Sequence, residues 1–343
     1  MKARFIPVEE AVGMVIPHDL TEIRPGEFKG PAFRKGHVIR AEDIPRLKRM
    51  GKDHIYALEL EPGELHEDEA ALRLAKAVAG PGVTYGTEIK EGKVTFYAAY
   101  DGLLKIDVEA LLSLNLLGEI ILSTKHTDFF VRKGEAVAAG RAVPLVVKED
   151  LLVKVEEIAG KTDLLAVKPP VIKKVGLVIT GNEVYFGRVE DAFVPALTPK
   201  LEAFGLEVLA VRFCPDDQAF IKKTLEEVLA QGAELVLVTG GMSVDPDDVT
   251  RHAIAALGVS DLVYGSPVLP GAMFLVAYRG GTPILGIPAC GMYFRTTVLD
   301  LVLPRLICGE KVKKEDIARM GHGGFCFGCK TCRFPVCPFG RGG

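Results

Sequence analysis

Three short segments rich in glycine, hydroxyl and carboxylate side chains could carry chemistry in this sequence of 343 residues. They occupy 180–183, 239–248 and 286–291, and each follows an apolar run typical of a buried strand. Glycine lets a backbone approach a bulky or anionic ligand, and threonine and serine hydroxyls add hydrogen-bond donors. The pattern therefore predicts a site for a phosphate-bearing ligand. Its candidate binding residues are Thr180, Gly181, Asn182, Glu183, Gly240, Gly241, Ser243, Asp245, Pro288 and Cys290.

Four carboxylates accompany these segments, at Asp191, Asp245, Asp247 and Asp248. They would repel a bare phosphate, so we expect them to hold a divalent cation such as Mg²⁺, to balance an oxyanion, or to act as bases. A metal bound together with a phosphate resolves the conflict. The alternative is that Asp191 and Asp247 are helix caps and that the glycines only form turns. Neither a dinucleotide-binding G-x-G-x-x-G nor a Walker sequence follows these strands.

A second group of reactive side chains lies near the end of the chain, at Cys326, Cys329, Cys332 and Cys337. The spacing C-x2-C-x2-C-x4-C-Pro resembles, with one extra residue, the run that binds iron–sulfur clusters in bacterial ferredoxins. It predicts an iron–sulfur cluster, with zinc or redox-active free thiols as alternatives. Cys290 is expected at a helix start on the ligand site, where a lowered thiol pKa is plausible. Its sulfur could ligate a soft metal, or the side chain could simply pack.

The elements that must position the three segments are predicted as a doubly wound α/β domain over 171–310. Unbroken apolar runs at 175–180, 206–213, 234–239 and 283–287 alternate with helical patterns, which is typical of a parallel sheet covered on both faces. In such sheets, ligands bind beyond the carboxyl ends of the strands. A helix expected over 191–204 contains Pro195 and Pro199, which requires a late start or a kink. A single helix is expected over 292–307.

The remaining segments are assigned by their patterns. Residues 1–81 form a mixed α/β region with a helix over 66–79, and residues 82–170 form a β-rich module. The acidic run at 67–69 suits a helix N-terminus better than a metal site. Residues 311–343 are expected to be a charged linker followed by the cysteine tail.

Composition excludes several classes of function. A formal net charge of -3 gives no overall positive field for nucleic acid or an anionic membrane surface. No apolar stretch reaches the roughly 18 to 20 residues of a membrane-spanning helix, and the start lacks a signal-peptide pattern. We expect a cytoplasmic protein, in which clustered cysteines indicate a metal site before disulfides.

Taken together, the motifs resemble the molybdopterin-binding domain shared by molybdenum insertases (MoeA, gephyrin E domain) and Mog-type adenylyltransferases. The resemblance covers 171–308, and residues 8–51 also resemble the insertase N-terminal region. The matching segments are Thr-Gly-Asn-Glu at 180–183, Gly-Arg-Val-Glu-Asp at 187–191, Thr-Gly-Gly-Met-Ser-Val at 239–244, Asp-Val-Thr at 248–250, Gly271 and Gly-Ile-Pro at 286–288.

The resemblance implies a cytoplasmic protein of molybdenum or tungsten cofactor biosynthesis. Its ligands would be molybdopterin or its adenylate and molybdate or tungstate, with Mg²⁺ as cofactor. Asp191 and Asp248 match the acidic residues of the family motifs, and we assign them the catalytic role of a molybdopterin molybdenumtransferase. A homodimer is also expected from this resemblance.

Two other functions remain open. The insertase's N-terminal Asp-Asn-Ser-Ala-Met-Asp-Gly-Tyr-like segment is missing, which favours a non-catalytic cofactor carrier or redox-sensing chaperone that docks a molybdenum or tungsten oxidoreductase. The same domain type also occurs in CinA-like nucleotide pyrophosphatases, which would hydrolyse a nucleotide without binding a pterin.

Overall fold

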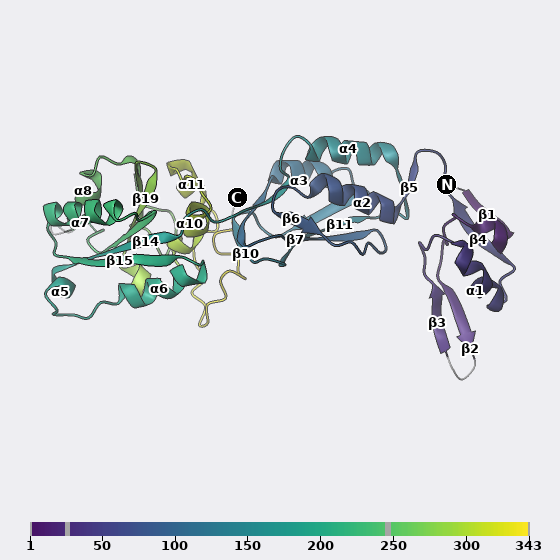
Figure 1. Ribbon diagram of the computed structural model, residues 1–343, viewed down its shortest axis with the longest axis horizontal. Helices are drawn as coiled ribbons and strands as arrows, with labels where there is room; N and C mark the ends of the chain where they lie inside the picture. Colours follow the sequence, from purple (N-terminus) through teal and green to yellow (C-terminus); the bar gives the residue numbers. More distant parts are fainter. Residues whose placement is uncertain (1, 25–27, 244–247, 342–343) are drawn as a thin grey trace. The chain divides into compact units, whose positions relative to one another are not determined.

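The long apolar runs of the second half of the chain form one six-stranded sheet (Figure 1). The computed structural model describes residues 2–24, 28–243 and 248–341, and the chain divides into two units, Met1–Lys168 and Pro169–Gly343. The strand order in the second unit is β15-β14-β16-β19-β18-β17. These strands are β14 (Lys174–Thr180), β15 (Glu207–Cys214), β16 (Leu235–Thr239), β17 (Ser260–Tyr264), β18 (Leu275–Arg279) and β19 (Thr282–Ile287).

The sheet is mostly parallel and carries helices on both sides, so the predicted α/β class is confirmed. β15, β14, β16 and β19 run parallel, and β18 and β17 are antiparallel additions at one edge. Ile221, Leu225 and Ile254 pack from α7 and α8 against one face, and Figure 1 shows α6 on the other side. The helices are α5 (Asn182–Tyr185), α6 (Phe193–Ala203), α7 (Gln218–Ala230), α8 (Thr250–Ala255), α9 (Cys290–Tyr293), α10 (Val298–Ile307) and α11 (Lys314–Arg319).

Three elements differ from the sequence prediction. α6 begins only at Phe193, which places Pro195 in its first turn and leaves Pro199 as the one proline inside the helix. The helix expected over 292–307 is two helices, because Thr297 caps α10 by accepting a hydrogen bond from the Leu299 amide. β17 was not predicted, since most of its side chains are exposed and it lacks the apolar run of its neighbours.

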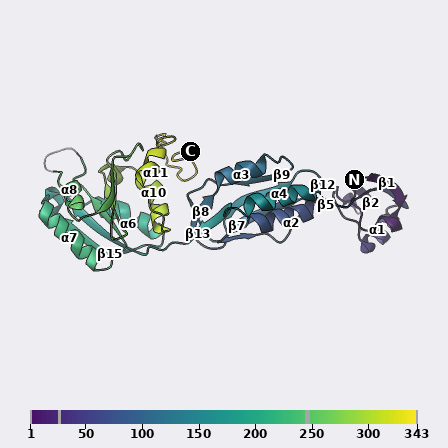
Figure 2. The same cartoon turned by 90° about the horizontal axis from the view of Figure 1, so that it is seen from above.

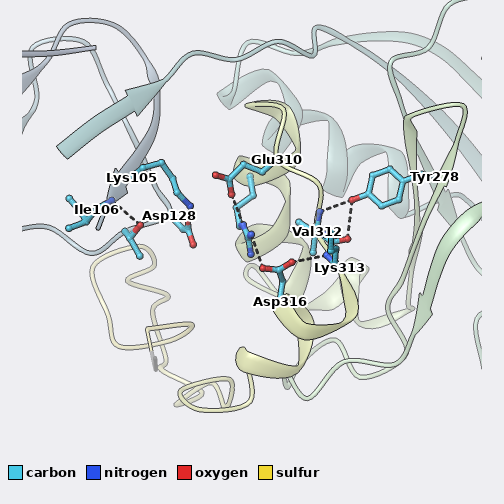
Figure 3. A network of polar contacts seen from close by, with 10 residues as sticks. Lys105, Ile106, Asp128, Tyr278, Glu310, Val312, Lys313 and Asp316 are labelled. Carbon is cyan, nitrogen blue, oxygen red and sulfur yellow. Dashed lines mark hydrogen bonds and ion pairs between the residues drawn. The ribbon is translucent and has the colours of Figure 1, made fainter. Parts of the chain in front are cut away.

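The segment after α10 is bound to the sheet and is not a free linker. The Tyr278 hydroxyl accepts a hydrogen bond from the Val312 amide (2.7 Å) and donates one to the Val312 carbonyl (3.1 Å), as Figure 3 shows. Arg305 pairs with Glu310 (2.9 Å) and with Asp316 of α11 (3.0 Å). The helix that follows the sheet is therefore fixed in place by polar contacts.

The cysteine tail also packs against the second unit. Phe339 is buried, and a side chain at Gly340 would lie 2.4 Å from the Leu301 side chain of α10. The Leu269 amide donates to the Gly324 carbonyl, and the Cys326 amide donates to the Leu269 carbonyl. Removing the tail would thus expose apolar surface.

The first unit contains two hydrophobic cores. One forms among residues 6–57, and the other joins helices α2 and α4 to the sheet β6-β7-β11-β9 and its neighbours. α2 and α4 lie side by side (Figure 2). Arg73 of α2 bridges Glu149 and Glu156 of α4. Residues 82–170 hold the helices α3 and α4 as well as the expected strands.

The elements of the first unit are short. The strands are β1 (Lys2–Pro7), β2 (Leu20–Arg24), β3 (Phe28–Phe33), β4 (His54–Glu59), β5 (Glu64–His66), β6 (Val83–Tyr85), β7 (Lys93–Ala98), β8 (Gly102–Ile106), β9 (Ile120–Thr124), β10 (Phe129–Val131), β11 (Ala136–Ala142), β12 (Val146–Lys148) and β13 (Leu165–Lys168). The helices are η1 (Val8–Ala11), η2 (Ala41–Asp43), α1 (Ile44–Arg49), α2 (Glu67–Val78), α3 (Val108–Asn115) and α4 (Glu149–Ala159). None of the helices in the described parts of the chain is long and apolar enough to cross a membrane.

Candidate functional site

The three predicted ligand segments lie at one edge of the six-stranded sheet. β14, β16 and β19 run in the same direction, with Ile179 beside Thr239 and Thr239 beside Ile287. Their carboxyl ends therefore meet, and the loops that follow them share that edge. This is the edge where the sequence places the candidate site, which we call the rim and define by the segments 180–183, 239–243, 248–250 and 286–291.

Threonine side chains fix the geometry of the rim. The buried Thr180 hydroxyl donates to the Thr239 carbonyl at 2.9 Å, and its oxygen lies 2.9 Å from the Thr250 hydroxyl. A hydroxyl has one proton, so Thr250 must be the donor in the second hydrogen bond. The end of β14, the end of β16 and the start of α8 are thereby joined.

Gly240 and Gly241 are required by this packing. Both have positive φ values, +82° and +58°. A side chain at Gly240 would lie 2.4 Å from the Thr180 carbonyl oxygen, and one at Gly241 would lie 2.3 Å from the Thr250 hydroxyl. The two glycines therefore allow the backbone to pass close to the threonines, whether or not a ligand is bound.

The loop after β16 is also held from its other side. Met242 is buried, and Gly286 of β19 leaves room for it, because a side chain at 286 would lie 2.6 Å from the Met242 sulfur. The Tyr264 hydroxyl donates to the Met242 carbonyl at 2.6 Å, and the Arg251 guanidinium lies 4.6 Å from the centre of the Tyr264 ring. The loop conformation is thus set by neighbouring strands and helices.

Asn182 and Glu183 follow β14 in different environments. The Asn182 amide donates to Asp216 at 2.9 Å, and the Asp216 amide donates to the Asn182 side chain at 3.2 Å. Asn182 therefore joins the loops after β14 and β15. Glu183 is exposed, and its carboxylate lies against Gly181, whose φ is +140°.

Asp191 caps a helix. One carboxylate oxygen accepts the Phe193 amide (2.9 Å), and the other accepts the Val194 amide (2.8 Å). These are free N–H groups of the first turn of α6, so the residue has a structural function that matches the capping alternative considered from the sequence.

Two buried oxygens at the rim have unused hydrogen-bonding capacity. The Thr239 hydroxyl and Oδ2 of Asp248 are inaccessible to solvent and have no hydrogen-bond partner within the described chain. Buried polar atoms are usually paired, so each such atom calls for an explanation such as a bound ion or ligand. Asp248 is thus the predicted catalytic residue whose carboxylate is not committed to the fold.

The described part of the rim offers one candidate ligand for the predicted Mg²⁺. Across the described ranges, no three histidine, cysteine, aspartate or glutamate side chains gather as a metal site. Mg²⁺ commonly binds through one or two carboxylates together with substrate phosphates and water. Asp248 fits that pattern as a single ligand. Asp245 and Asp247 lie outside the described residues, and the partly buried Ser243 lies at the end of the described loop.

The pKa of the Cys290 thiol is raised, not lowered as the sequence suggested. Pro288 is buried, and Cys290 begins α9, as predicted. However, burial raises the pKa of the Cys290 thiol, an effect only partly opposed by its own backbone and by Lys200. The desolvation of the thiolate outweighs any stabilisation from a helix of one turn. Cys290 is therefore a protonated thiol near neutral pH.

The four tail cysteines are not gathered into a metal site. Cys329 is exposed, whereas Cys332 places its sulfur 3.2 Å from the Thr296 hydroxyl. No group of three or more ligating side chains forms at residues 326–337, all of which the structure describes. This arrangement does not fit a cluster or a zinc ion.

Thr239 and Thr250 belong to the rim and Asp216 contacts it through Asn182, but none of the three was among the candidate site residues. Thr239 lies in a predicted ligand segment, but the sequence does not show whether a hydroxyl at the end of a strand is paired within the core or faces a ligand. Asp216 had a usable signal, because it follows the fourth parallel strand in a Cys-Pro-Asp-Asp loop. The candidate binding residues predicted from the sequence follow three other strands.

Two family models of known proteins match parts of the chain. Residues 176–307 match the family model described as a probable molybdopterin binding domain. Residues 5–59 match a family described only as a domain of unknown function, so the N-terminal resemblance to insertases stays a prediction.

Individual relatives cover only part of the chain. A CinA-like protein of Mycobacterium avium (strain 104) is 33% identical over 99 residues, which are 29% of this chain and 23% of the relative. The molybdopterin biosynthesis enzyme MoaB of Thermus thermophilus is 26% identical, with a TM-score of 0.36 over 41% of this chain and 100% of that one. The tungsten cofactor synthesizing protein MoaB of Pyrococcus furiosus is 19% identical, with a TM-score of 0.34 over 40% of this chain and 94% of that one. The chain thus spans less than a quarter of the length of the curated relative.

Proposed function

We propose that the second unit binds molybdopterin, or its adenylate, at the rim and acts in molybdenum or tungsten cofactor biosynthesis. The observation that carries the proposal is a pair of buried oxygens, Thr239 Oγ1 and Asp248 Oδ2, that have no partner among the described residues and lie within the segment matching the molybdopterin-binding family model. A ligand or ion that contacts them would relieve the cost of burying them, which is typically about 1–3 kcal/mol for each such group.

The phosphate of the ligand would bind the loops after β14 and β16. Gly240 and Gly241, which pass close to Thr180 and Thr250, would supply backbone amides to the phosphate, and the Thr180–Thr250 contact would hold this backbone in position. Loops fixed in this way need little reorganisation when a ligand binds.

Asp248 would hold Mg²⁺ or position the oxyanion in an insertase-like reaction. A bound Mg²⁺ would neutralise phosphate and molybdate charge. Asp191 would act by fixing the start of α6, because its two oxygens already accept backbone amides. The chain's own contribution would be to orient the phosphate and to supply one unpaired carboxylate.

Enzyme and carrier versions of this function can be separated. Incubating the full chain with molybdopterin adenylate, molybdate and Mg²⁺ should release AMP and form molybdenum cofactor if the chain is an insertase. A carrier would retain the pterin without releasing AMP. If the chain acts as a carrier, the cysteine tail would sense redox state or dock an oxidoreductase.

The second candidate is a CinA-like nucleotide pyrophosphatase, favoured by the 33% identity to a CinA-like protein over 99 residues. It would hydrolyse the diphosphate bond of a nucleotide in the presence of Mg²⁺ and would retain no pterin. Hydrolysis together with an absence of pterin binding would replace the first proposal by this one.

A further inference from the structure

The first unit contains a cavity of 310 Å³ that the proposed function does not use. Its wall combines cationic, anionic and aliphatic side chains, including Lys35, Glu67, Arg141 and Val143. The volume is at the lower end of the range of about 300–1,000 Å³ typical of small-molecule sites. A ligand that fills it must therefore be small.

Glu67 is the unusual residue of this wall. It is the first residue of α2 and only 6% exposed, yet its carboxylate makes no hydrogen bond or ion pair to any other described residue. Two glycines with positive φ make room for it. A side chain at Gly36 would lie 2.6 Å from a Glu67 carboxylate oxygen, and one at Gly92 would lie 2.9 Å from its Cβ.

The neighbours of Glu67 already perform the structural work expected of an acidic helix start. His66 donates from Nε2 to the Gly36 carbonyl at 2.6 Å and accepts the Asp68 amide on Nδ1 at 3.2 Å. Asp68 accepts the Gly92 amide at 2.8 Å, and Glu69 is exposed. Capping and dipole effects therefore do not require a buried carboxylate at Glu67.

Partial loss of water without a partner among the described residues is costly for this carboxylate. Desolvation raises the pKa of the Glu67 carboxyl, and the nearby His66 and Arg141 only partly oppose the effect. A cationic or hydrogen-bond-donating ligand group would restore favourable interactions for the carboxylate.

Two cationic groups on the wall are also uncommitted. Arg34 pairs with Glu91 at 3.1 Å. By contrast, the Lys35 ammonium has no partner within the described chain, and the Arg141 guanidinium donates only from Nε to the Ala142 carbonyl at 3.2 Å. The cavity thus offers cations for an anionic group and, at Glu67, an acceptor for a donor group.

We propose that this cavity binds a free α-amino acid, with the ligand carboxylate at Lys35 and Arg141 and the ligand ammonium at Glu67. Charge balance favours a zwitterion, because a simple oxyanion would face the carboxylates of Glu67 and Asp19 in the same cavity. A metal cation is disfavoured, since no three ligating side chains gather in the described residues. Val143 and Leu145 would contact an aliphatic side chain.

Isothermal titration of the full chain with each of the twenty common L-amino acids tests the proposal. We expect at least one to bind with a dissociation constant below about 1 mM. Glu67→Gln should weaken that binding at least tenfold, and Glu69→Gln, the matched exposed control on the same helix, should leave it unchanged. 4-Methylpentanoate, which lacks the ammonium group, and inorganic phosphate should bind at least tenfold more weakly than the best amino acid.

Three outcomes would overturn the proposal: no amino acid binds, phosphate binds as well as the best amino acid, or Glu67→Gln binds like the parent. Lys35→Gln provides a second test if Glu67→Gln fails to fold, because Lys35 is exposed and its ammonium has no partner to lose within the described chain. It should weaken amino acid binding while leaving the melting temperature unchanged, and unchanged affinity would count against the site. None of these measurements depends on pterin binding at the rim.

Discussion

The side-chain oxygens of Thr180 and Thr250 lie 2.9 Å apart in the interior of the second unit, although 70 residues separate them in the sequence. Thr180 ends β14, and Thr250 begins α8. Because Thr180 also donates to the Thr239 carbonyl, one hydroxyl connects the two loops that would bind the ligand. The ends of β14 and β16 and the start of α8 are therefore joined at the rim, where two buried oxygens have no partner among the described residues.

Asp248→Ala should remove the Mg²⁺ dependence of ligand binding or turnover while preserving the fold. Its carboxylate makes no hydrogen bond to a described residue and one of its oxygens is buried, so we expect the free energy of unfolding to stay the same or to rise, by up to about 1–3 kcal/mol. Molybdopterin binding with and without Mg²⁺, together with urea denaturation, measures both effects.

Asp191→Ala is the matched control for this prediction. It should reduce the free energy of unfolding by about 1 kcal/mol, because it removes the cap from the Phe193 and Val194 amides. If Asp248→Ala destabilises the protein as much as Asp191→Ala does, Asp248 is a structural residue. If it folds and functions like the parent, the site assignment is wrong.

Gly241→Ala should weaken pterin binding far more than Gly205→Ala. A methyl group at 241 would lie 2.3 Å from the Thr250 hydroxyl and would disturb the Thr180 contact, whereas nothing lies within 4 Å of the corresponding position at 205. Both glycines have positive φ, so each substitution should cost roughly 1 kcal/mol in backbone strain. Affinities measured at a temperature where both variants are folded separate recognition from stability, and equal affinities would refute the argument.

Cys290 should react with iodoacetamide more slowly than the exposed Cys329 at pH 7.5. Burial raises the pKa of Cys290, so the reactive thiolate forms only at higher pH than for an ordinary thiol near 8.5. The raised pKa also stabilises the fold below the unfolded-state pKa, and this contribution is lost as pH rises through the folded-state pKa. Mass spectrometry of labelled peptides across a pH series measures the rates. Faster labelling of Cys290 at neutral pH would show that its thiol is activated.

The sequence predicts iron or zinc at the four tail thiols, but the structure does not bring these thiols together. Metal binding would therefore require the thiols to move from the described arrangement. Metal analysis of protein purified without oxygen decides between a cluster, zinc and free thiols. Cys329→Ser is the preferred variant, because Cys329 is exposed, whereas truncation would also remove the buried Phe339. Loss of bound metal in Cys329→Ser would support the site, and a metal-free parent protein would leave redox-active thiols as the remaining account.

The sequence predicted the architecture of the second unit because its central strands are buried on both faces. β14 and β16 read as continuous apolar runs, and the glycines after them marked the loops. The exposed edge strand β17 lacked that signal. The break between α9 and α10 had one, since Thr297 and Asp300 form a capping box across the predicted helix.

The candidate site could be located from the sequence, but the function of each of its residues could not. Asp191 and Asp248 are both aspartates near a helix start, and only hydrogen-bond partners distinguish the cap from the uncommitted carboxylate. The Thr180–Thr250 contact depends on strand order, which composition and periodicity do not encode. The thiol pKa of Cys290 likewise depends on burial and not on position in the sequence.

Pterin retention tests the central claim most directly. The full chain is purified without oxygen, incubated with molybdopterin and desalted, and the bound pterin is then released, oxidised and measured by fluorescence, with Gly241→Ala and Gly205→Ala treated in parallel. We predict stoichiometric pterin on the parent and on Gly205→Ala, and a large loss on Gly241→Ala. If the folded parent retains no pterin, before or after incubation, the rim is not a molybdopterin site.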